Sequence, residues 1–136
     1  MVQVFCSKKG SGKTKALLEM ANNRVNDCKG HIVYIDDDDD IALRLDRKIR
    51  FICTNEFEFE NFSNFYGLIC GILSEDYDID TIFIDGLLNI AHAHIKDAEK
   101  VLNKTENLSK KFNVDFYINI SCKIDEAPQF IKKYVK

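Results

Sequence analysis

A short segment rich in glycine and lysine has the residue types needed to hold a phosphate group. Residues 7–14 read SKKGSGKT and lie between an apolar run and a stretch with helical spacing. Two glycines let the backbone turn its N–H groups toward phosphate oxygens, and the start of a helix adds positive potential. We expect phosphate contacts from Ser7, Gly10, Ser11, Gly12, Lys13, Thr14 and Lys15.

The end of this segment, called the phosphate loop below, matches a known pattern. Gly12, Lys13 and Thr14 fit the last three positions of G-x-x-x-x-G-K-[ST], while Ser7 stands where the pattern begins with glycine. Lys13 is expected to neutralise β- and γ-phosphate charge, and Thr14 to offer its hydroxyl to Mg²⁺. The loop lysines Lys8 and Lys9 are expected to be solvated.

An aspartate follows the apolar run at residues 81–84. A carboxylate at the carboxyl end of a central strand can hold Mg²⁺ opposite Thr14, so Asp85 is the second predicted metal residue. The next residue is Gly86, so any catalytic base must come from another part of the chain.

Five aspartates at positions 36–40 follow another apolar run, at residues 31–35. If that run is a parallel strand, these carboxylates lie at the same sheet edge as the phosphate loop. Two interpretations stay open: one aspartate is catalytic or metal-linked, or the run is a solvated turn in which Asp40 caps a helix. Asn119 likewise either senses the γ-phosphate or satisfies local hydrogen bonds, and His92 with His94 lacks the third ligand that a metal site needs.

Strand-like and helix-like segments alternate along the chain. Apolar runs typical of buried strands cover residues 2–6, 31–35, 49–53, 81–84 and 114–120. Helical spacing covers residues 16–25, 62–73 with Asn61 as the cap, 95–108, and a final helix opened by Pro128. This alternation predicts an α/β fold with a mainly parallel sheet covered on both faces, as a single domain over residues 1–136.

The composition of the chain makes some classes of binding partner and location unlikely. The net charge of −3 makes nucleic acid an unlikely partner, because affinity for nucleic acid comes from clustered lysine and arginine. No apolar run approaches membrane-spanning length, and no signal peptide is recognisable. The five cysteines include no CxxC pair and are expected to be buried free thiols in a reducing cytoplasm.

The order of these pieces resembles the ATPase core of RecA-like P-loop proteins. The resemblance rests on SKKGSGKT, on YIDDD at residues 34–38, on IFID at residues 82–85 and on LSKKFNVDFYINIS at residues 108–121. It implies a three-layer fold with a five-stranded sheet in the order 3-2-4-5-1. It also implies a water-activating role for Asp38, with Asp37 as its neighbour, and a γ-phosphate sensor at Asn119 or Ser121. Aspartate replaces the family's glutamate, and no DNA-binding loops follow Asp85. The chain also resembles small clostridial-type ATP-binding P-loop proteins.

These features together predict Mg²⁺-dependent binding of ATP or GTP, with slow hydrolysis, in a switch or an assembly subunit. A homo-oligomer or a protein partner is expected, because the four arginines all lie between residues 24 and 50, away from the phosphate loop and the two later strands. One alternative is a small nucleoside or nucleotide kinase of the thymidine-kinase type. The other is a nucleotide-binding interaction module that does not hydrolyse.

Overall fold

A five-stranded, all-parallel sheet forms the centre of the computed structural model, which describes residues 1–8, 10 and 12–135. Four strands are predicted apolar runs, extended by one to three residues or unchanged, and the fifth is shifted by one residue, from 114–120 to 115–121. The strands are β1 (Val2–Ser7), β2 (His31–Asp36), β3 (Ile49–Cys53), β4 (Ile79–Asp85) and β5 (Asp115–Ser121). The α/β architecture with a parallel sheet is therefore confirmed.

The strands lie in the order β1-β5-β4-β2-β3, which is 3-2-4-5-1 when read from the β3 edge. Strand β5 pairs with both β1 and β4, so one strand separates the strand that leads into the phosphate loop from the strand that ends at Asp85. A strand in this position is covered on both faces, and Ile118 and Ile120 are buried as expected.

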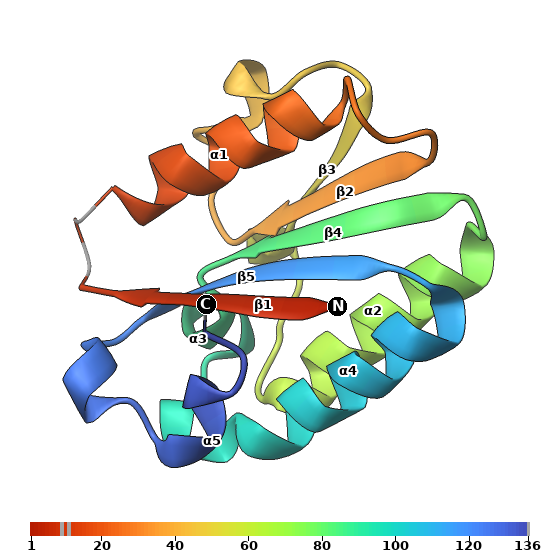
Figure 1. The fold of residues 1–136 in the computed structure, drawn as a ribbon. Coiled ribbons are helices and arrows are strands. Elements are labelled where there is room, and N and C mark those ends of the chain that lie inside the picture. Colours follow the sequence, from red (N-terminus) through yellow and green to blue (C-terminus); the bar gives the residue numbers. More distant parts are fainter. Residues whose placement is uncertain (9, 11, 136) are drawn as a thin grey trace.

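Helices cover the two faces of the sheet unequally (Figure 1). Helix α1 (Lys13–Arg24) packs on one face, where Leu17, Leu18 and Ala21 join a core that includes aromatic residues of the sheet. The opposite face carries the larger core and is covered by α2 (Phe62–Glu75), α3 (Leu87–Ala91), α4 (Glu99–Phe112) and α5 (Gln129–Lys132). The phosphate loop thus leads into the helix that covers the smaller core.

Capping side chains and short turns determine where the helices begin more closely than the spacing of apolar residues does. The side chain of Asn61 accepts a hydrogen bond from the backbone N–H of Asn64 at 3.1 Å, which confirms it as the cap of α2. The helix predicted over residues 95–108 starts later, at Glu99, because residues 95–97 form a separate 3₁₀ turn. The short helix α3 was not predicted.

Two further expectations can be compared with the structure. All five cysteines are free, but each is half-buried, so the prediction of buried thiols was wrong in degree. Three of them lie at or beside strand ends, Cys70 lies on α2, and Cys28 lies in the connection between α1 and β2. Among the described residues, no helix has the length and apolar character that crossing a membrane requires.

Candidate functional site

The phosphate loop connects the end of β1 to the start of α1 through two left-handed residues. Gly10 has φ 84° and Gly12 has φ 90°, values that a residue with a Cβ adopts only with strain. Gly12 is the N-cap of α1 and provides no side chain to bond the first-turn N–H groups. These donors are therefore available to an anion. Ser11 and Lys9 lie outside the described residues.

The two residues after Gly12 point to different partners. Lys13 is half-buried, and its Nζ donates to the carbonyl of Lys8 at 3.2 Å, across the loop. The hydroxyl of Thr14 donates to Oδ1 of Asp85 at 3.3 Å. The first turn of α1 is thereby linked to the end of β4, two strands away from β1. Lys15 is exposed and is not among the described residues that line the cavities beside the loop.

Three polar side chains lie side by side where β2, β4 and β5 end. Asp36 is in register with Asp85, and Asp85 with Asn119, so all three point to the α1 face of the sheet. Each is buried, with an exposed fraction of 8, 5 and 1 % respectively. We call these three residues the polar row.

The carboxylate of Asp85 is the centre of the polar row. It accepts hydrogen bonds from the Tyr34 hydroxyl at 2.9 Å and from Nδ2 of Asn119 at 3.1 Å, besides the Thr14 hydroxyl. The Asn119 contact is a local hydrogen bond, which was one of the two roles predicted for that residue. Burial, followed by the nearby Asp85 carboxylate, raises the pKa of the Tyr34 hydroxyl, which therefore keeps its proton as a donor.

Three aromatic rings, of Tyr34, Phe83 and Tyr117, pack next to the polar row on the same face of the sheet. The rings of Tyr34 and Phe83 stack with centroids 6.0 Å apart, and those of Phe83 and Tyr117 with centroids 5.2 Å apart. Each ring lies two residues before a member of the polar row, since side chains on one face of a strand repeat every two residues. The carboxylates therefore lie on a packed apolar layer.

Two carboxylates next to each other on such a layer repel each other. Burial and the neighbouring Asp85 raise the pKa of Asp36 to about 8, even though the backbone N–H of Asp37 donates to Asp36 Oδ1 at 2.7 Å. Asp36 is therefore held in its neutral form unless a cation lies beside it. Asp36 belonged to the aspartate run predicted for this edge of the sheet, but Asp37 and Asp38 were singled out instead, although Asp36 directly follows the buried run.

The remaining aspartates turn away from the sheet. Asp37 is half-buried, whereas Asp38, Asp39 and Asp40 are exposed. Oδ1 of Asp38 accepts from the backbone N–H of Asp40 at 2.9 Å, which closes a local turn. The alternative in which Asp40 caps a helix was wrong, because the next 3₁₀ turn begins after Ile41 and has no side-chain cap.

A cavity of about 600 Å³ opens between the phosphate loop and the polar row. Its basic side is formed by the loop with Lys13, and its acidic side by Asp36, Asp37, Asp38, Asp40 and Asp85. Ser121 also lines it, while Asn119 and Ser7 line a second hollow of about 370 Å³ on the other side of Lys13. The structure therefore brings together residues predicted from four separate segments. Asn89 of α3, which also lines the cavity, was missed because that short helix was not predicted.

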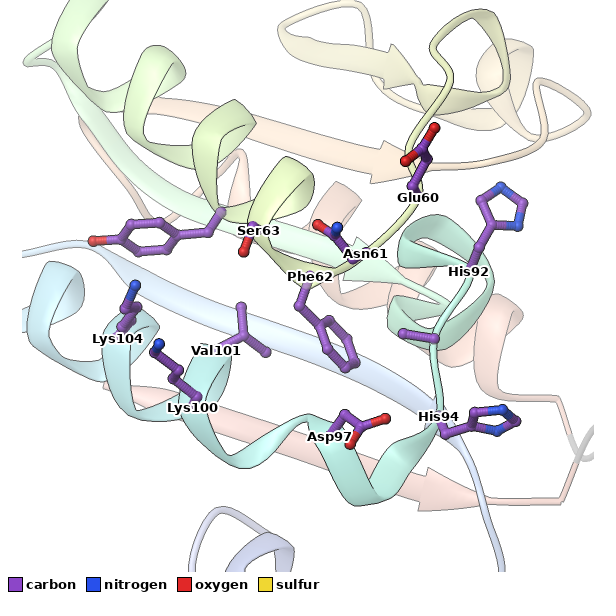
Figure 2. Close-up of a pocket in the computed structure, with 12 residues that line it drawn as sticks. Glu60, Asn61, Phe62, Ser63, His92, His94, Asp97, Lys100, Val101 and Lys104 are labelled. Carbon is purple, nitrogen blue, oxygen red and sulfur yellow. The ribbon is translucent and has the colours of Figure 1, made fainter.

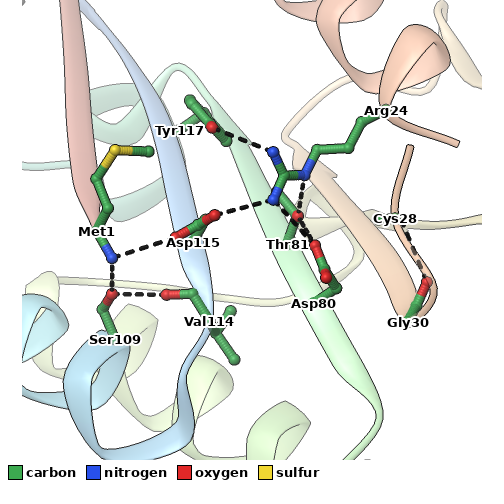
Figure 3. A network of polar contacts seen from close by, with 10 residues as sticks. All are labelled: Met1, Arg24, Cys28, Gly30, Asp80, Thr81, Ser109, Val114, Asp115 and Tyr117. Atoms are coloured by element: carbon green, nitrogen blue, oxygen red, sulfur yellow. Dashed lines mark hydrogen bonds and ion pairs between the residues drawn. The ribbon is translucent and has the colours of Figure 1, made fainter. Parts of the chain in front are cut away.

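Helix α1 is fixed at its far end by one arginine (Figure 3). The guanidinium of Arg24 donates to Asp80 at 3.1 Å and to Asp115 at 2.9 Å. It also donates to the Thr81 hydroxyl at 2.6 Å, and it lies over the ring of Tyr117. These contacts join the last turn of α1 to the starts of β4 and β5. They set the position of the first turn at the opposite edge of the sheet.

The chemistry of the donors fits a hard cation beside an anion. The hydroxyl of Thr14 and the carboxylates of Asp85 and Asp36 are oxygen ligands of the kind that Mg²⁺ prefers. The glycine loop, the free N–H groups of α1 and Lys13 offer positive potential within the same cavity. Comparison with models of known protein families gives no match for this chain, and no curated protein matches it significantly.

Proposed function

We propose that this chain binds ATP or GTP together with Mg²⁺ through a minimal RecA-like P-loop fold. The single observation that carries the proposal is the hydrogen bond from Thr14 to Asp85, made beside a loop with two left-handed glycines. A serine or threonine after the loop lysine and an aspartate at a strand end are the two protein groups that hold Mg²⁺ in P-loop nucleotide-binding proteins. The placement of β5 between β1 and β4 supports the RecA-like assignment.

The phosphates would lie along the loop, with Lys13 on their negative charge. Thr14 and Asp85 would hold Mg²⁺, which would neutralise phosphate charge. The proximity of Asp36 to Asp85 adds a reason for a cation here, because a divalent ion relieves the repulsion between the two carboxylates.

Hydrolysis requires a base that can orient water, and the candidates are Asp37 and Asp38. Both line the cavity that the phosphate loop faces. An aspartate is one methylene shorter than glutamate, so its reach toward an attacking water is smaller. We infer slow turnover with intact binding, as expected of a switch or of a subunit that works in an assembly.

Thermal unfolding in the presence of nucleotide tests this proposal. A ligand that binds only the folded state raises the free energy of unfolding by about 2.7 kcal/mol at a hundredfold excess over Kd. We expect Mg-ATP or Mg-GTP to raise Tm, and Lys13→Ala to abolish most of the increase. Lys29→Ala, an exposed lysine beyond the other end of α1, is the matched control and should keep it. An unchanged Tm with every nucleoside triphosphate tested would refute binding.

A further inference from the structure

A separate cavity of about 460 Å³ lies between the start of α2 and the start of α4, away from the phosphate loop (Figure 2). We call it the helix cavity. Its floor is apolar, formed by half-buried Phe62, Tyr66 and Ala93 and by buried Val101. Its rim is made of exposed charged and polar side chains. A floor and rim of these kinds are typical of small-molecule sites, which are mostly apolar with a few polar groups that fix orientation.

The charges on the rim are separated by sign. Figure 2 shows Lys100 and Lys104 at one end of the cavity, with Phe62 and Val101 between them and the other end. Figure 2 shows the acidic Glu60 and Asp97 toward the other end, where His92 and His94 also lie.

Lys104 is held where it can meet a ligand. Its Nζ lies 4.8 Å from the centroid of the Tyr66 ring, a cation–π contact across the cavity from α4 to α2. Lys100 and Lys104 make none of the ion pairs found among the described residues. Two lysines beside an aromatic floor therefore offer uncompensated positive charge to an anion.

A smaller hollow of about 340 Å³ lies between the helix cavity and the 600 Å³ cavity beside the phosphate loop, which we call the loop cavity. This hollow shares His92, Ala93 and His94 with the helix cavity, and it shares Asp37 and Asn89 with the loop cavity. Only the short segment of residues 88–94 would thus separate a ligand in the helix cavity from the candidate nucleotide site.

We propose that the helix cavity binds a bipolar organic molecule. Its anionic group lies against Lys100 and Lys104, its apolar body covers Phe62 and Val101, and its cationic group faces Glu60 and Asp97. Charge complementarity at both ends, with an apolar stretch between them, specifies this class rather than a simple anion. The site is formed by the starts of α2 and α4 and by the residues just before them, so binding there does not depend on nucleotide binding.

Three related probes test the proposal by NMR titration of the ¹⁵N-labelled protein without nucleotide. 4-(Aminomethyl)benzoate carries both charges across a ring, 4-methylbenzoate lacks the amine, and benzylamine lacks the carboxylate. We expect the first to bind with the highest affinity, with saturable shift changes at the amides of Ser63 and Val101. Absence of saturable binding of 4-(aminomethyl)benzoate, or shift changes that avoid α2 and α4, would overturn the proposal.

Two double variants separate the two ends. Lys100→Gln with Lys104→Gln should weaken both carboxylate probes about fivefold and leave benzylamine unaffected. Glu60→Gln with Asp97→Asn should weaken both amine probes to a similar degree and leave 4-methylbenzoate unaffected. Lys110→Gln, an exposed lysine in the last turn of α4, is the control that should change none of them. Equal effects on all three probes would contradict the bipolar site.

Discussion

The carboxyl group of Asp36 is held in a setting that favours its neutral form. Its pKa is raised to about 8 by burial and by Asp85, whereas in the unfolded chain it titrates near 4. Between these values the unfolded chain releases a proton that the folded chain keeps. The free energy of unfolding must therefore fall as pH rises through this window, and level off above it.

Removing this carboxyl should remove its share of the pH dependence. We predict that Asp36→Asn flattens the decline in stability between about pH 5 and pH 8, measured by urea unfolding with EDTA present. Asp39→Asn, at an exposed position in the same run, should retain the decline of the parent protein. An identical decline in the parent and in Asp36→Asn would show that Asp36 is not held in its neutral form.

The rate of hydrolysis should distinguish Asp37 and Asp38, which line the cavity, from Asp39, which does not. We predict that Asp37→Asn or Asp38→Asn lowers kcat by about 10²-fold with little change in nucleotide affinity, since a general base acts in the transition state. Single-turnover hydrolysis beside a binding titration measures both quantities. Asp39→Asn is the control, because Asp39 is not among the residues that line the cavity. If all three variants hydrolyse like the parent, the run is only a solvated turn.

At the scale of elements, Arg24 determines where α1 lies. Its guanidinium carries bonds to Asp80, Thr81 and Asp115, so its loss removes the cation that pairs with Asp80 and leaves Asp115 with only the N-terminal amine of Met1. We predict that Arg24→Gln lowers the free energy of unfolding by about 1–3 kcal/mol. Arg24→Lys should lie between the parent and this variant, because a lysine keeps the charge but not the planar fork. Chemical denaturation measures all three, and a variant as stable as the parent would contradict the anchoring role.

The strands could be predicted from the sequence, whereas part of the helical layer could not. Residues 32–35 and 116–118 form unbroken apolar runs because parallel strands are covered on both faces. Helix α3 has only five residues, too few for a helical period to be recognised, and it begins after the left-handed Gly86. Residues 95–108 share an apolar face throughout, so spacing alone did not show that a 3₁₀ turn precedes Glu99.

The segments that form the candidate site could be predicted from the sequence, but the contacts between their residues could not. The phosphate loop, Asp85 and the aspartate run each stand out by residue type. Which aspartate meets Asp85 depends on strand register, and the register places Asp36 there rather than Asp38. The contact of Tyr34 with Asp85 depends on the same register, and a tyrosine inside an apolar run gives no separate signal of it.

For the molecule as a whole, the cavity between the phosphate loop and the polar row has no arginine among the described residues that line it. These residues include acidic groups and one lysine. An arginine on the γ-phosphate raises the rate of hydrolysis by roughly 10³–10⁵-fold in P-loop proteins. We predict that a lone protomer hydrolyses slowly and that specific activity rises with protein concentration or with a partner. Light scattering beside an ATPase assay checks this. A monomer that turns over about ten ATP per second or more would contradict it.

We propose above that a nucleotide and Mg²⁺ bind together at the edge of the sheet where Thr14 contacts Asp85. Isothermal titration calorimetry with ATP, once with Mg²⁺ and once with EDTA, tests this binding directly. We expect tighter binding with Mg²⁺ in the parent protein, and loss of that difference in Asp85→Asn while binding in EDTA is retained. Equal affinity with and without Mg²⁺ in the parent, or an Asp85→Asn variant that keeps the full difference, would contradict it.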